Sequence, residues 1–169
     1  MTEFSRPIPL AEIDRRPITR RIEAVPAEES ALARRLGVEG LSGLRAELTV
    51  AKRRGVVSVT GLFEVQISQT CVVTLEPFST VLRGEIDESY AEVEDDDEAG
   101  EVEIDIETPE PLAGDFLDIG ELVVQCAALE IDPHPRAPEA DLASLEAPAP
   151  EMIDPAGPFA ALGKLRRNS

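Results

Sequence analysis

Few residues of this chain combine the type and the spacing that a reaction needs, and the densest group is acidic. It consists of Glu94, Asp95, Asp96, Asp97 and Glu98. Clustered carboxylates could hold Mg²⁺ for RNA hydrolysis. A calcium loop is disfavoured because its spaced ligands and central glycine are lacking. Such dense like charges repel one another and resist packing, so we predict a mobile acidic loop and no metal site.

The other candidates for chemistry are isolated residues. Cys71 and Cys126 are the only cysteines, and His134 is the only histidine. His134 lies between two prolines with no nucleophile near it in the sequence, so nothing marks it as a catalytic base. These three residues are too far apart in the sequence to suggest a tetrahedral metal site. We predict two free, largely buried thiols, no cofactor and no enzymatic activity.

The net charge of −18 is concentrated in one part of the chain. Residues 1–84 hold 12 Lys and Arg against 10 Asp and Glu, residues 85–110 hold none against 14, and residues 111–169 hold 4 against 10. A field of this sign repels phosphate backbones and favours a basic protein partner. Two small basic groups could still touch RNA, although such cations usually only aid solubility. They are Lys52, Arg53 and Arg54 at a predicted turn, and Lys164, Arg166 and Arg167 near the C-terminus.

Alternation of apolar and polar residues predicts most of the chain before residue 107 to be β-structure. The longest run, 56–78, exceeds a normal strand, so we expect a bulge or corner at Gly61 and Gln69. Strands are also predicted around 44–50, 82–90 and 102–106, with a hairpin turn at 52–55 and another turn at 76–79. Prolines and arginines before residue 23 indicate short edge strands or extended arms.

Two segments carry helix signals at both ends. Residues 26–36 begin with Pro26 and end before Gly37, which suits a left-handed cap. Residues 118–130 begin with Asp118 and Glu121, spaced as in a capping box. The apolar face of the second helix is predicted to be Ile119, Leu122, Val123, Cys126 and Leu129.

The predicted fold class is therefore α+β, with an antiparallel sheet that could close into a barrel, two helices packed on it and a flexible C-terminal tail. We divide the chain into a single α+β domain at 1–136, an acidic Ala/Pro-rich linker at 137–157 and a basic amphipathic tail at 158–169. No secretory leader or apolar run long enough to span a membrane is apparent, so the expected location is the cytoplasm.

Three segments resemble the YceD family, in the form found in alphaproteobacteria: 69–78 (QTCVVTLEPF), 110–138 and 158–165. The residues that carry the resemblance are Cys71, Thr74, Leu75, Glu76, Pro77, Phe78, Asp118, Asp132 and Pro133. The resemblance implies a role in making the large ribosomal subunit without a known catalytic activity. Many members have a Cys-x-x-Cys pair where this chain has Cys71 and Thr74, and a second pair near the C-terminus that is missing here. A metal knuckle therefore does not carry over, and Cys71 is expected to serve as packing.

The functional prediction is a non-enzymatic factor that supports large-subunit assembly and 23S rRNA accumulation. It would bind a basic ribosomal protein or assembly factor through its acidic residues, and its cations could approach ribosomal RNA. The alternatives are a metal-dependent RNA-processing nuclease and an acidic chaperone for one basic client. The sequence leaves open the partner, direct RNA contact, the oligomeric state and the order of the tail.

Overall fold

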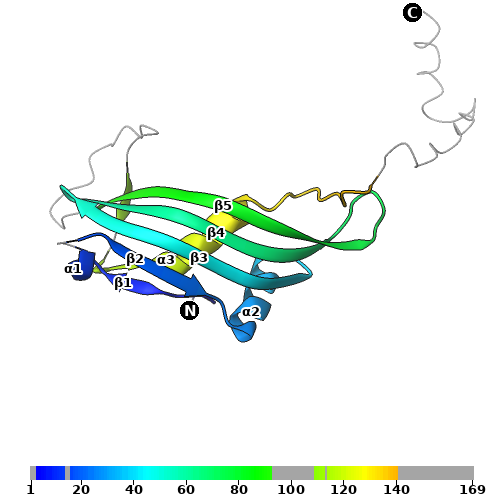
Figure 1. The fold of residues 1–169 in the computed structure, drawn as a ribbon, viewed down its shortest axis with the longest axis horizontal. Coiled ribbons are helices and arrows are strands. Elements are labelled where there is room, and N and C mark those ends of the chain that lie inside the picture. The colour runs from blue at the N-terminus through cyan, green and yellow to red at the C-terminus, as the bar shows by residue number, and fades with distance from the viewer. Residues whose placement is uncertain (1–2, 14–15, 93–108, 113, 141–169) are drawn as a thin grey trace, which may run out of the picture. The chain divides into compact units, whose positions relative to one another are not determined.

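A computed structural model describes residues 3–13, 16–92, 109–112 and 114–140 and has the predicted α+β class (Figure 1). The strands are β1 (Pro7–Pro9), β2 (Ile18–Glu23), β3 (Gly40–Arg53), β4 (Val56–Thr70), β5 (Pro77–Glu92), β6 (Glu110–Leu112) and β7 (Phe116–Asp118). The helices are α1 (Leu10–Ile13), α2 (Pro26–Leu36) and α3 (Ile119–Leu129). All of them belong to one compact unit, residues 1–137, while residues 138–169 form a second unit. Of that unit only 138–140 are described, so the linker and the tail stay predictions.

The main sheet has five strands in the order β2-β3-β4-β5-β6. Its first four strands are antiparallel, as predicted, but β6 pairs parallel to the end of β5, so the sheet is mixed. The predicted closure into a barrel is wrong. β2 and β6 lie at opposite edges and do not pair with each other, so the sheet is open. A separate two-stranded sheet joins β1 to β7. The strand predicted at 102–106 lies outside the described residues.

The long alternating run forms two strands: β4 ends at Thr70, beside the corner predicted at Gln69, whereas the irregularity predicted at Gly61 is absent. β4 passes through Gly61 without a break, because a Cβ there would lie 2.2 Å from the carbonyl oxygen of Glu47 and glycine allows this close approach of β3. The irregularity is in β3 instead, where the pairing register shifts between Ser42 and Arg45. The turn predicted at 76–79 occupies the residues just before it, since β5 already begins at Pro77.

The hairpin between β3 and β4 is confirmed, with Arg54 at φ 52° and Gly55 at φ 80°. Two positive φ angles in succession are typical of the tight turn that matches strand twist. β4 and β5 then pair antiparallel from Val56 opposite Ala91 to Thr70 opposite Pro77. These three long strands form the platform on which the rest of the domain packs.

One face of this platform is covered. α1, β1, β7 and α3 lie on that side and α2 packs against β3 (Figure 1). The strand side chains that point toward them are apolar and almost completely buried; they include Leu48, Val50, Val57, Val59, Phe63, Val65 and Ile67. The two predicted helices are present within one residue of their expected bounds. In the described part of the chain, no helix has the length and apolarity needed to cross a membrane.

The face of α3 differs in part from the prediction. Ile119, Leu122 and Val123 are buried, but Cys126 is half-buried and Leu129 is 86 % exposed. In the same last turn Ala127 is buried, so the helix stays packed on the sheet, and of the predicted apolar face only Leu129 points away from it. Asp118 caps the helix by accepting the Gly120 and Glu121 amides at 3.0 and 3.2 Å.

The second half of the predicted capping box is absent, because the Glu121 side chain turns to Arg35 of α2, whose Nη1 lies 2.7 Å from Glu121 Oε2.

The N-terminal segment fixes the helices to each other, which the sequence did not indicate. Phe4 is fully buried, and the Arg6 amide donates to Asp118 Oδ1 at 2.7 Å. The Arg6 guanidinium makes two hydrogen bonds of 2.9 Å to Glu28 in the first turn of α2. One short segment thus holds the start of α2 and the start of α3 in register with the sheet.

Candidate functional site

The open face of the sheet carries two rows of mostly charged side chains that run across the strands. Cross-strand pairing aligns one row, consisting of Glu23, Arg45, Glu64 and Arg83. Two residues along each strand, the next row consists of Arg21, Glu47, Leu62 and Glu85. Because side chains two apart on a strand share a face, both rows point away from the core. We call these eight residues the open-face rows.

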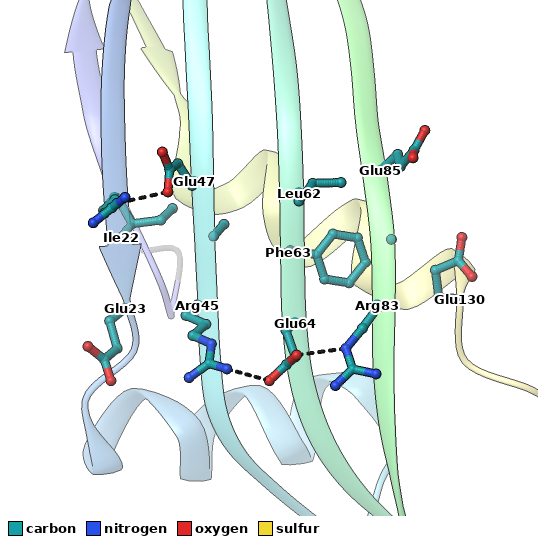
Figure 2. Close-up of a pocket in the computed structure, with 13 residues that line it drawn as sticks. Ile22, Glu23, Arg45, Glu47, Leu62, Phe63, Glu64, Arg83, Glu85 and Glu130 are labelled. Carbon is teal, nitrogen blue, oxygen red and sulfur yellow. Dashed lines mark hydrogen bonds and ion pairs between the residues drawn. The ribbon is translucent and has the colours of Figure 1, made fainter.

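Glu64 is the centre of the first row (Figure 2). Its Oε1 lies 2.6 Å from Arg45 Nη2 and its Oε2 lies 2.7 Å from Arg83 Nε. The hydrogen bond from Arg83, together with the positive charge of both arginines, lowers the pKa of Glu64. In the second row the Arg21 Nε lies 2.8 Å from Glu47 Oε2. These ion pairs link neighbouring strands at the solvent-exposed surface of the sheet.

The rows line an open cavity of about 1010 Å³ (Figure 2). Leu62 is 60 % exposed in its middle, while the neighbouring Phe63 ring points to the covered side. Glu85 forms no ion pair with any other described residue. The cavity is lined by arginine, glutamate and apolar residues without a cysteine, histidine or hydroxyl nucleophile. Such a surface can bind a polar or charged partner.

A second site gathers the motif residues at the end of the sheet where β4 turns into β5. We call residues 71–76 the Cys71 turn. It closes on itself through the Cys71 amide to the Glu76 oxygen and the Leu75 amide to the Cys71 oxygen, both at 2.9 Å. Residues 132–137 run alongside it: Val72 donates to the Pro135 oxygen at 2.9 Å, and Gln69 Nε2 to the Asp132 oxygen at 3.3 Å. The two motif segments are thus neighbours in space.

Cys71 does more than fill space in the core. Its side chain is completely buried, and the Sγ accepts amide hydrogen bonds from Val73 at 3.4 Å, Thr74 at 3.5 Å and Ala137 at 3.3 Å. A hydrogen bond from the Thr74 side chain, followed by these amides, lowers the pKa of Cys71 to about 7. The sulfur therefore organises the turn and ties it to the segment after α3.

Of the predicted binding residues, only Lys52, Arg53 and Arg54 are described, and none of them lines the cavity. Lys52 lies half-buried at the end of β3, and Arg53 and Arg54 are exposed at the hairpin tip. The acids Glu94, Asp95, Asp96, Asp97 and Glu98, and the cations Lys164, Arg166 and Arg167, lie outside the described residues. His134 is exposed and its amide donates to Asp132 Oδ1 at 2.8 Å. In the part of the chain that the structure describes, no three His, Cys, Asp or Glu residues are placed to hold a metal ion.

The open-face rows were missed by sequence reasoning. Alternation alone indicated which residues of β3, β4 and β5 face solvent, so the residues of the open face could be predicted. The rows depend on which residue lies opposite which, and the shift between Ser42 and Arg45 sets that alignment. A signal was present in the alternating signs of the exposed charges, which favours opposite-charge neighbours once strands pair.

Comparison with known proteins identifies one family. Neither the curated proteins nor the solved structures include a match to this chain. The sequence pattern of the family described as "Large ribosomal RNA subunit accumulation protein YceD" matches residues 59–166, from within β4 to near the C-terminus. This range covers most of the chain and includes the Cys71 turn, β5 and α3. The chain belongs to the YceD family.

Proposed function

We propose that this protein is a non-enzymatic factor that supports assembly of the large ribosomal subunit and accumulation of 23S rRNA. The observation that carries the proposal is the family match over residues 59–166, since the family is described by large ribosomal RNA subunit accumulation. The protein acts in the cytoplasm by holding a basic ribosomal or assembly protein.

The distribution of charge supports a basic protein partner. Residues 85–110 contain 14 acids and no lysine or arginine. Of the acids in this range that the structure describes, Glu85 and Asp87 are exposed on the open face. Acidic surfaces accelerate encounters with basic proteins and repel phosphate, so a protein is favoured over RNA as the first contact. Direct RNA contact is left to the exposed cations Arg53 and Arg54 at the hairpin tip.

The nuclease alternative has no supporting arrangement within the described residues. The carboxylates on which it rested, Asp95 to Asp97, lie outside them. The alternative of an acidic chaperone for one basic client differs from the proposal only in what the bound protein does afterwards.

Deletion of the gene tests the role. The expected result is a lower ratio of mature 23S rRNA to small-subunit rRNA and fewer free large subunits in sucrose gradients, both restored by the wild-type gene. A variant with Asp95, Asp96 and Asp97 changed to Ala tests for nuclease chemistry. The purified variant and the purified wild type should leave precursor RNA equally intact. An unchanged rRNA ratio after deletion would contradict the proposed role.

A further inference from the structure

The outer edge of β5 is the longest unpaired strand edge in the described part of the chain. β5 pairs with β4 from Pro77 to Ala91, but on its other side it pairs with β6 only at Tyr90 to Glu92. Between Val81 and Ser89 no backbone hydrogen bond reaches that side from another described element. An edge of this kind presents amides and carbonyls of alternate residues that can pair with an added strand.

The opposite edge of the sheet is protected in the usual way. β2 has six residues, follows Pro17 and carries Arg20 and Arg21. A short strand with proline and positive charges discourages further pairing. β5 has no proline along 81–89, and its charges there are acidic except for Arg83, which Glu64 holds at 2.7 Å, so this edge excludes acidic strands but not basic ones. The two edges are therefore not equivalent, and among the described residues, which do not include 93–108, the β5 edge has no strand paired to it along 81–89.

Acids flank the β5 edge on both faces of the sheet. Glu85 and Asp87 are exposed on the open face, and Glu88, Glu110 and Glu130 lie on or near the covered side. Figure 2 shows Glu85 and Glu130 beside β5 at its outer side. None of the five forms an ion pair with another described residue.

Tyr90 and Cys126 lie among the acids on the covered side. Burial, then the charges of Glu88 and Glu110, raises the pKa of Tyr90 to about 12. Burial and the charges of Glu88 and Glu130 likewise raise the pKa of Cys126. The edge is thus surrounded by negative charge that lacks a counter-charge within the described residues.

We propose that β5 binds an extended basic segment of a partner protein, which adds a strand along Val81 to Ser89. Successive side chains of the added strand point to opposite faces. Lysines or arginines on one face would meet Glu85 and Asp87, and those on the other would meet Glu88, Glu110 and Glu130. Exposed Val81, at 45 %, offers an apolar contact beside the edge.

This inference rests on the proposed function and adds the docking surface and the chemistry of the partner. Single-stranded RNA is disfavoured because its phosphates would face these five acids and its backbone has no strand-like pattern of amides. A second copy of the chain would bring two acidic edges together, which like charges oppose. Both occupants are outcomes of the test.

The test uses the full chain and three labelled probes. The first is a peptide of about ten residues in which pairs of lysines alternate with pairs of valine or threonine, so that lysines lie on both faces and the peptide spans the edge. The second is the same peptide with every backbone amide N-methylated, which keeps its charge and removes the donors that strand pairing needs on both of its edges. The third is a single-stranded RNA of similar length. Binding is measured by fluorescence anisotropy, and protection of the amides of 81–89 by NMR hydrogen exchange.

The unmodified peptide should bind at least about tenfold more tightly than its N-methylated form and weaken as salt rises from about 50 to 200 mM. The change Glu85→Lys with Asp87→Lys should weaken binding by about tenfold or more, because attraction becomes repulsion. The matched control is Glu12→Lys with Asp115→Lys, which alters net charge equally at exposed acids away from the edge and should bind with an affinity close to that of wild type.

Several outcomes would overturn this inference. Equal binding of both peptides would show charge attraction without strand addition, tighter RNA binding would show the wrong class of partner, and a dimer in light scattering that blocks the peptide would show a second copy on the edge. A chain that binds no peptide while gene deletion still lowers 23S rRNA would refute the docking surface and leave the proposed function standing. Peptide binding together with an unchanged 23S rRNA level after gene deletion would refute the proposed function and leave the docking surface standing.

Discussion

The two faces of the five-stranded sheet are built from alternate residues of the same strands, yet they differ completely. On the covered face, side chains such as Leu48, Val59 and Phe63 are almost inaccessible and pack under α3 and the N-terminal segment. On the open face, Glu64 joins Arg45 and Arg83 above an open cavity. Burial of apolar area dominates folding, whereas exposed ion pairs contribute little. Stability therefore resides on one face, and the other can be altered for binding.

The largest difference is expected between two neighbours on β4. Phe63→Ala should lower the free energy of unfolding by about 3–5 kcal/mol, because it leaves a cavity under α3. Leu62→Ala, one residue earlier and 60 % exposed, should change it by no more than about 0.5 kcal/mol. Chemical denaturation of both variants measures this. Equal losses would mean that the open face also carries the fold.

The next effect concerns the close approach of β3 and β4. Gly61→Ala should cost about 1–3 kcal/mol of unfolding free energy, because the added methyl would meet the Glu47 carbonyl oxygen and force the strands apart. The control is Gly40→Ala, whose methyl would lie 3.5 Å from Ser68 Oγ in ordinary contact and should cost about 0.5 kcal/mol or less. A tolerated Gly61→Ala would show that the strand pairing can relax.

A smaller effect is expected at the helix cap on the covered side. Asp118→Ala should cost about 1–2 kcal/mol of unfolding free energy, because α3 loses its N-cap and the Arg6 amide loses its acceptor. Asp118→Asn keeps a good capping group and should cost less.

The Asp118 cap also makes a pH prediction. Burial opposes its charge, but hydrogen bonds from Ser5 and from the amides of Arg6, Glu121 and Gly120 outweigh this and hold the pKa of Asp118 below its ordinary value. Its contribution is therefore present above the unfolded-state pKa of about 4 and is lost as pH falls through the lower folded-state value. Unfolding curves should show wild type losing its advantage over Asp118→Asn on acidification, and a constant difference would contradict the shift.

The smallest effect belongs to the open face. Glu64→Gln removes the charge between Arg45 and Arg83 and should lower stability only slightly, by an amount that shrinks as NaCl is added. The double variant with Arg83→Gln should show coupling at low salt that vanishes at high salt. Thermal unfolding across a salt series measures this. A large loss of stability that does not depend on salt would mean that the open face also stabilises the fold.

Local signals predicted much of this fold from the sequence. Pro26 and Gly37 bound α2, Asp118 starts α3, and Gly55 closes the β3–β4 hairpin, because caps and turns depend on residues a few positions apart. The exposure of Leu129 could not be predicted, since this residue continues the apolar spacing of α3 but points away from the sheet.

The remaining features depend on distant residues. Apolar alternation continues through Cys71 and Val73, so the lapse at Gln69 indicated a corner, but the contacts of the turn with Pro135 and Ala137 could not be predicted locally. The open-face rows follow from register, which local patterns do not determine. The candidate site was therefore less predictable than the fold, because it is assembled across four strands.

The buried sulfur of Cys71 can report transient opening of the Cys71 turn. The hydrogen bonds that lower the pKa of Cys71 to about 7 favour its reactive thiolate form, yet its side chain is 0 % exposed. In a Cys126→Ser background, a thiol reagent can react only when residues 132–137 lift away from the sheet. The labelling rate then reads the opening equilibrium directly, and a partner that rigidifies this end would slow it.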